Sequence, residues 1–164
     1  MSAPHRPLDD LRLYRMSRLL AVAGSMVIRL CEGRFGITRR EWRLIATLAS
    51  QGELNSSQLA AHAQLDRART SKAVGSLVAK ALVSRVARAG DRRQVQLALT
   101  AQGQMLYEAL FPLVTQINAE LTDALGSDDA VRFDDALRRL QARAECMVEA
   151  AVLPKADRGR RGVR

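Results

Sequence analysis

Residues 56–100 decide the fold of this chain, and they read SSQLAAHAQLDRARTSKAVGSLVAKALVSRVARAGDRRQVQLALT. Their apolar spacing predicts a short helix from about Ser56 to Ala63, with Asn55 or Ser56 as its N-cap. A second helix is predicted from about Asp66 to Ala81, after a tight turn at Gln64-Leu65. Two short helices joined by such a turn are typical of a helix-turn-helix, whose second helix enters the DNA major groove.

The rest of this stretch predicts a β-hairpin. Residues 83–87 are rich in β-branched side chains, and residues 94–99 alternate polar and apolar as a half-buried strand does. Gly90-Asp91 between them is typical of a turn. A hairpin that follows a recognition helix is a wing, and we expect its tip to carry Arg88, Asp91, Arg92 and Arg93.

Helical patterns precede this stretch. Residues 8–31 carry apolar side chains at mainly helical spacing, on a face too wide for a lone surface helix. After a break at 33–36, Thr38 and Glu41 have the spacing of a capping box. We expect the helix that they open to bury Trp42.

Two more helices are predicted after the wing. Thr100 caps the first, which extends to about Ala124 and contains Pro112. Ser127 caps the second, with acidic residues in its first turn, where the helix dipole favours them. Its expected core residues include Val131, Phe133, Leu137, Leu140 and Met147. The wide apolar faces of the first and last helices predict a dimer that buries them.

The charge of the chain is concentrated. The 164 residues carry a formal net charge of +9, which suggests a polyanionic partner. Residues 66–94 hold eight basic side chains against two acidic ones, and residues 155–164 hold five against one. The internal cluster coincides with the predicted helix-turn-helix and wing, whereas the tail could equally be a solvated segment.

Several classes of protein are disfavoured. No apolar run approaches the roughly 18 residues of a membrane span, and residues 1–7 lack the apolar core of a signal peptide. The two cysteines, Cys31 and Cys146, are far apart, which favours a reduced, cytoplasmic protein. The histidines of the chain are His5 and His62, and the sequence has no metal-ligand cluster and no glycine-rich phosphate loop. We therefore expect that the protein is not an enzyme and that it needs no metal or cofactor.

Three motifs resemble the multiple-antibiotic-resistance-regulator (MarR) family of winged helix-turn-helix proteins. Residues 91–100, DRRQVQLALT, are similar to its wing pattern D-x-R-x-x-x-x-x-L-T, and residues 35–42 to the entry into its second helix. The third is QLA at 58–60 leading to LDR at 65–67. The resemblance covers about residues 8–148. It implies a homodimer whose first and last helices interlock, and a transcriptional repressor, less often an activator, that a small ligand releases from DNA.

The expected fold is mainly α with a small β-wing. A dimerisation helix (1–34) precedes the winged helix-turn-helix domain (35–100). Dimerisation helices (101–150) and a disordered basic tail (151–164) follow.

The DNA-binding residues are expected in three groups. The start of the first short helix offers phosphate contacts, the recognition helix offers base contacts, and the wing tip offers groove or phosphate contacts. Asp91 is expected to brace a wing arginine, and the resemblance makes Arg93 that arginine. The expected contacts are Ser56, Ser57 and Gln58, then Arg67, Arg69, Thr70, Ser71, Lys72 and Ser76, and on the wing Arg88, Arg92 and Arg93. Two-fold symmetry predicts an inverted-repeat operator.

The family places its effectors between the dimer helices and the winged domain. The candidates here are Arg18, Met26, Trp42 and Arg43, and the resemblance suggests an aromatic carboxylic acid or its coenzyme A thioester. Structural roles are open alternatives, with Trp42 in the core and the arginines in salt bridges. Two alternatives to a ligand-controlled regulator also remain, a non-specific architectural DNA-binding protein and a regulator that senses oxidants through Cys31.

Overall fold

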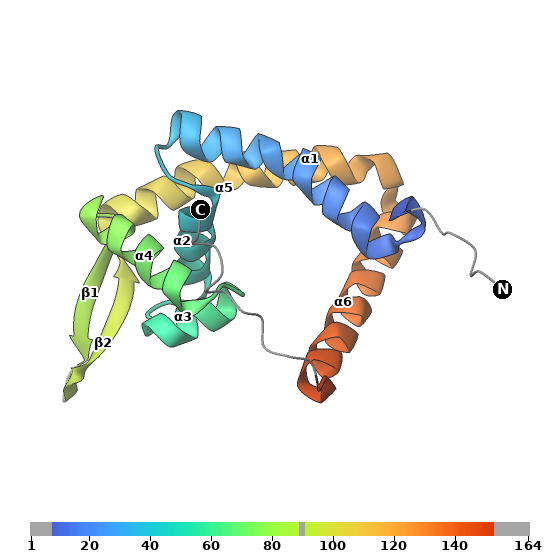
Figure 1. Ribbon diagram of the computed structural model, residues 1–164. Helices are drawn as coiled ribbons and strands as arrows, with labels where there is room; N and C mark the ends of the chain where they lie inside the picture. The colour runs from blue at the N-terminus through green and yellow to red at the C-terminus, as the bar shows by residue number, and fades with distance from the viewer. Residues whose placement is uncertain (1–7, 89–90, 153–164) are drawn as a thin grey trace, which may run out of the picture. The chain divides into compact units, whose positions relative to one another are not determined.

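The computed structural model describes residues 8–88 and 91–152, apart from the side chains of 87–94. It confirms the predicted class, mainly helical with one small sheet (Figure 1). The chain divides between Leu121 and Thr122 into two compact units. The first holds the predicted DNA-binding elements.

The chain enters the first unit through a 3-10 turn (Leu8–Asp10) and helix α1 (Arg12–Arg34), followed by α2 (Arg39–Gln51). The capping box at the start of α2 is confirmed. The Glu41 amide donates to Thr38 Oγ1 at 3.2 Å, and the Thr38 amide donates to the Glu41 carboxylate at 2.6 Å.

The helix-turn-helix consists of α3 (Ser56–His62) and α4 (Arg67–Ala79), close to the predicted bounds. Asn55 is the N-cap of α3 and Asp66 that of α4. Helix α4 packs against both α2 and α3.

The predicted wing is an antiparallel pair, β1 (Val83–Arg88) and β2 (Asp91–Leu99). Val83 pairs with Leu99 at its base, and the register shifts between Ala87 and Arg88. Leu54, just before α3, exchanges backbone hydrogen bonds with Leu97 of β2 at 3.2 and 2.8 Å. The base of the wing is thereby joined to the start of the helix-turn-helix.

The core of the first unit forms where these elements meet. It contains apolar side chains from α2, α3, α4 and the hairpin, with Leu110 of α5 (Ala101–Thr122). Trp42 is 6% exposed, as the core interpretation predicted, and its ring stacks on that of Tyr107 at 5.8 Å. The Gly103 amide donates to Thr100 Oγ1 at 3.0 Å, which confirms the predicted cap.

The second unit contains a 3-10 turn (Asp123–Leu125) and helix α6 (Ser127–Ala150). The prediction that Ser127 caps this helix is wrong. Gly126, with φ of 70°, is the cap residue and has no side chain to form a cap bond, while Ser127 already lies inside the helix.

The expected core residues of α6 are not buried within one chain. Leu137 is half-buried, and the other four are exposed, from 39% for Phe133 to 69% for Val131. They carry the apolar pattern of a core, but this chain does not cover them. A dimer that buries them stays a prediction.

Candidate nucleic-acid interface

Helix α4 has one inward and one outward face. Thr70, Ala73, Val74 and Leu77 are buried. Among the predicted DNA-contacting residues of α4, the exposed ones are Arg67, Arg69, Ser71 and Lys72. This division follows helical periodicity, because buried positions recur every three or four residues. The first two turns of α4 therefore present three cations and a hydroxyl to solvent.

Two of the residues predicted to contact bases are turned toward the protein. Thr70 is fully buried, and its hydroxyl donates to the Asp66 carbonyl at 2.9 Å. The Ser76 hydroxyl donates to the carboxylate of Glu41, which is 2% exposed. These two expectations are corrected, because both side chains are turned toward the protein and bonded within it.

The start of α3 also differs from the prediction in one respect. Ser56, Ser57 and Gln58 are exposed as expected. However, the amides of Ser57 and Gln58 already donate to Asn55 Oδ1, at 3.0 and 2.9 Å. The serine hydroxyls, rather than these amides, are therefore the groups available to a phosphate.

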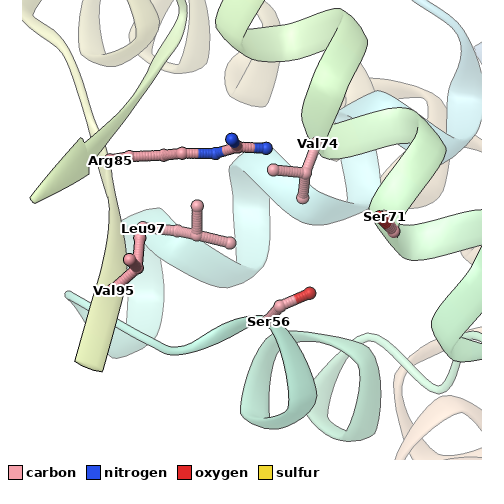
Figure 2. A pocket seen from close by; sticks show the side chains of 6 residues that line it. All are labelled: Ser56, Ser71, Val74, Arg85, Val95 and Leu97. Atoms are coloured by element: carbon pink, nitrogen blue, oxygen red, sulfur yellow. The ribbon is translucent and has the colours of Figure 1, made fainter. Parts of the chain in front are cut away.

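A groove of about 260 Å³ lies between the helix-turn-helix and the base of the wing. Figure 2 shows the Arg85 side chain reaching from β1 toward Val74 on α4, with Ser56 and Ser71 on the helical side. Val95 and Leu97 of β2 complete the lining.

Arg85 was not among the predicted contacts, although a signal for it was present. Side chains two apart on a strand share a face, and Val83 is buried beside α4. The same face therefore carries Arg85 next along the strand, at the edge of the core.

Not every cation of the basic stretch is free to meet DNA. Lys80 Nζ lies 3.0 Å from Glu41 Oε2 and donates to the Gly36 carbonyl at 2.9 Å. Arg69 Nε lies 3.2 Å from the Asp66 carboxylate, although its side chain remains 64% exposed. Lys80 is therefore neutralised within the fold, whereas Arg69 is tethered at the surface.

Glu41 is the buried anion of this region. Burial raises its pKa, but hydrogen bonds from Ser76, Thr38 and Lys80, together with the charge of Lys80, lower it by more. The pKa of Glu41 is thus below its ordinary value, and the carboxylate is ionised at neutral pH.

The wing tip is described by its backbone alone. Arg88 ends β1 and pairs, after the register shift, with Asp91 at the start of β2, which also holds Arg92 and Arg93. The side chains of all four lie outside the described part, so their DNA contacts and the bracing role of Asp91 stay predictions.

The structure does not bring the four effector candidates together. Arg18 pairs with Asp9 at 2.9 Å. The Arg43 guanidinium donates to the Ala63 carbonyl at the end of α3. Trp42 lies in the core, and Met26 on α1 is 44% exposed.

Cys31 does not have the properties of an oxidant sensor. Its side chain is fully buried. Burial, together with the nearby Glu32 charge, raises the pKa of its thiol. A sensing cysteine needs an accessible thiol with a lowered pKa, so these features disfavour the redox alternative.

The described residues also bear on metal binding and on membrane insertion. Among residues 8–88 and 91–152, no group of three or more His, Cys, Asp or Glu side chains is placed to hold a metal ion. No helix in the same ranges is both long and apolar enough to cross a membrane.

Comparisons with known proteins agree with this geometry. The model of the MarR family matches residues 35–94. The HTH-type transcriptional regulator FarR of Neisseria gonorrhoeae is 32% identical over 104 residues, which cover 63% of this chain and 71% of FarR.

Solved structures show the same fold. A MarR family regulator from Silicibacter pomeroyi DSS-3 is 25% identical, with a TM-score of 0.74 over 85% of this chain and 99% of its own. NadR in complex with 4-hydroxyphenylacetate is 26% identical, with a TM-score of 0.63 over 85% of this chain and 96% of NadR. This chain belongs to the MarR family of winged helix-turn-helix, DNA-binding transcriptional regulators.

Proposed function

We propose that this chain is a repressor that binds an inverted-repeat operator as a homodimer and is released by a small aromatic carboxylic acid or its coenzyme A thioester. The outward face of α4 beside the groove is the observation that carries the DNA-binding part. Arg67, Arg69 and Lys72 stand there at the start of the recognition helix, with Arg85 on the facing strand.

These residues suit two kinds of contact. Residues near the start of a recognition helix reach base edges, and a guanidinium can bond O6 and N7 of guanine together. Arg67 and Arg69 are assigned this role. The hydroxyls of Ser56 and Ser71 line the groove with Arg85, so the groove suits a backbone phosphate, which fixes register without reading sequence.

The dimer is supported by apolar surface outside this interface. Leu13, Leu20 and Val22 of α1 are 78%, 59% and 73% exposed, and α6 has no buried residue in the single chain. Exposed apolar side chains in this number mark an interaction site. Two-fold symmetry then sets two recognition helices about one helical turn of DNA apart, roughly 34–36 Å.

The ligand part draws on a relative and on one local feature. NadR has been solved with 4-hydroxyphenylacetate, an aromatic carboxylic acid. In this chain, Trp42, Tyr107 and Phe111 form a run of aromatic rings that ends at Phe111, which is 47% exposed. Arg18 and Met26 remain exposed candidates for contact with such a ligand.

Selection from a random-sequence duplex library tests the DNA-binding part directly. The wild-type chain is expected to enrich an inverted repeat, and 4-hydroxyphenylacetate or a related acid is expected to weaken its binding. Enrichment of no sequence would favour the architectural alternative. Binding that every acid in the panel leaves unchanged would remove the ligand class from the proposal.

Arg69→Ala separates specific from architectural binding. It is expected to cost about 1–3 kcal/mol on the selected duplex and to relax preference at one position of each half-site. Arg132→Ala is the matched control, because Arg132 is an exposed arginine of α6 that pairs with Asp129. Equal weakening on all sequences would take base reading away from Arg69.

Leu140→Glu tests the dimer. Leu140 is 54% exposed in the single chain, so the change should leave the first unit folded while it disrupts the interface. Sedimentation is expected to show a monomer, and Arg139→Glu, at an exposed position beside it, is the control. A Leu140→Glu chain that remains a dimer would place the interface elsewhere.

A further inference from the structure

The C-terminal end of the recognition helix is held by a polar cluster around the buried carboxylate of Glu41. Glu41 and Gly36 lie at the junction of α1 and α2, and Lys80 is the C-cap of α4. Lys80 Nζ donates to both Glu41 carboxylate oxygens, at 3.1 and 3.0 Å, and to the Gly36 carbonyl at 2.9 Å. One ammonium thus connects the end of α4 to two points on a different part of the fold.

The two side chains of the Glu41–Lys80 pair differ in their exposure to solvent. The Glu41 side chain is 3% exposed and that of Lys80 is 37% exposed. Removal of Lys80 leaves the buried charge of Glu41 without compensation. The carboxylate also accepts from the Thr38 amide and the Ser76 hydroxyl, so it bonds both α2 and α4.

The Lys80 ammonium is directed at acceptors within the protein. It lies within hydrogen-bond distance of three acceptor oxygens, as many as the N–H donors that an ammonium carries. Lys72 differs in position, because it lies in the second turn of α4 on the outward face, beside Ser71. Two lysines of one helix therefore have different surroundings and are expected to respond differently to substitution.

We propose that Glu41 and Lys80 are positioning residues for DNA recognition, which fix the recognition helix against the α1–α2 junction so that its outward face meets the bases in one pose. The inference rests on the DNA-binding function above and deepens it. Side chains that read bases must be held in place by residues whose own conformations are locked. Neither Glu41 nor Lys80 touches DNA, and both act through the placement of α4.

Glu41→Gln gives the sharpest test, because electrostatics and positioning predict opposite signs. The change removes a negative charge from the DNA-binding unit, so an electrostatic effect alone would strengthen binding. Loss of positioning is expected to weaken binding to the selected duplex on the order of tenfold, with little change on a scrambled duplex. Binding that is unchanged or tighter on the selected duplex overturns the proposal.

Lys80→Met, with Lys72→Met as its matched control, tests the other partner. Lys80→Met is expected to lower affinity for the selected duplex without changing the dependence of affinity on salt. Lys72→Met is expected to reduce the slope of log affinity against log salt by about 0.9, as loss of one phosphate contact does. A similar reduction for Lys80→Met would make Lys80 a phosphate contact and overturn the proposal.

Two controls separate positioning from unfolding and from failure of the proposed function. All affinities are measured well below each variant's melting temperature, and Lys80→Arg, which keeps the charge and the pairing, is expected to retain most of the wild-type affinity. Loss of specific binding in Lys80→Arg equal to that in Lys80→Met would contradict the pairing. A wild-type chain that enriches no duplex refutes the proposed operator binding instead, which is a different result from unaltered binding by Glu41→Gln.

Discussion

The two ends of the recognition helix are held in different ways. At its start, Asp66 accepts a hydrogen bond from the Arg69 amide at 2.8 Å, and most side chains of the first turn face solvent. At its end, Lys80 Nζ donates to the Gly36 carbonyl in the α1–α2 junction. Thr100 and Gly103, at the start of α5, contact the two residues that follow Lys80, which are Ala81 and Leu82. The contrast indicates a helix that is fixed in the fold at its far end and exposed for contact at its near end.

Gly103→Ala should give the largest effect on stability, because it acts on the fixed end. A Cβ at Gly103 would lie 2.0 Å from the backbone carbonyl oxygen of Leu82, which cannot move without displacing the hairpin. We expect the free energy of unfolding to fall by about 1–3 kcal/mol, measured by urea unfolding.

Gly75→Ala is the matched control for that change. Gly75 lies in the exposed middle of α4, and a Cβ there would meet nothing within 4 Å. Because alanine favours a helix over glycine, we expect a gain of roughly 0.5–1 kcal/mol. Equal losses in the two variants would remove the distinction between the fixed end and the exposed part of the helix.

At the near end, Asp66→Ala should have a smaller effect. It removes the N-cap of α4, which should cost about 1 kcal/mol within a range of roughly 0.5–2, again by urea unfolding. Asp66→Asn retains a capping oxygen and is expected to lose less. An alanine variant as stable as wild type would show that the near end depends on contacts other than its cap.

Signals that are local in sequence predicted most of the fold. The caps depend on residues two or three positions away. Those at Thr38 and Thr100 were confirmed, and of the two alternatives Asn55 and Ser56, the structure has Asn55. The prediction for Ser127 was wrong because a serine that precedes a helical pattern can be either the N-cap or a residue of the first turn. The left-handed φ of Gly126 decided between them.

The candidate site was predicted less completely, because contacts distant in sequence decide which side chains face out. Thr70 and Ser76 lie among exposed residues of α4, but helical rotation turns them toward the protein. Lys80 is one of the eight basic residues counted in 66–94, but Glu41, 39 residues away, neutralises it. Arg85 was missed although it shares a strand face with Val83, because the packing of the hairpin on α4 is what places that face beside the groove.

The pH dependence of stability examines the fixed end without altering its shape. The pKa of Glu41 lies below its ordinary value of 4.5, so the stabilisation is fully present above that value. It is lost as the pH falls through the lower pKa of the folded chain. Wild type should exceed Glu41→Gln in stability at neutral pH, and the difference should shrink on acidification. A difference that stays constant with pH would mean that the charge of Glu41 contributes nothing.

The smallest expected effect concerns the residue that follows Lys80. Ala81 has φ of 56°, a left-handed conformation that favours glycine, and its carbonyl accepts from the Thr100 hydroxyl at 2.6 Å. Glycine would relieve about 1–2 kcal/mol of steric cost but add conformational freedom to the unfolded chain, which leaves a net gain of about 0.5 kcal/mol. Ala79→Gly, the same change inside the last turn of α4, should instead lose up to about 1 kcal/mol. A gain in stability with weaker binding to the selected duplex would mean that the strained alanine helps to hold the far end of the helix. Unchanged binding would assign that role to Lys80 and Gly103 alone.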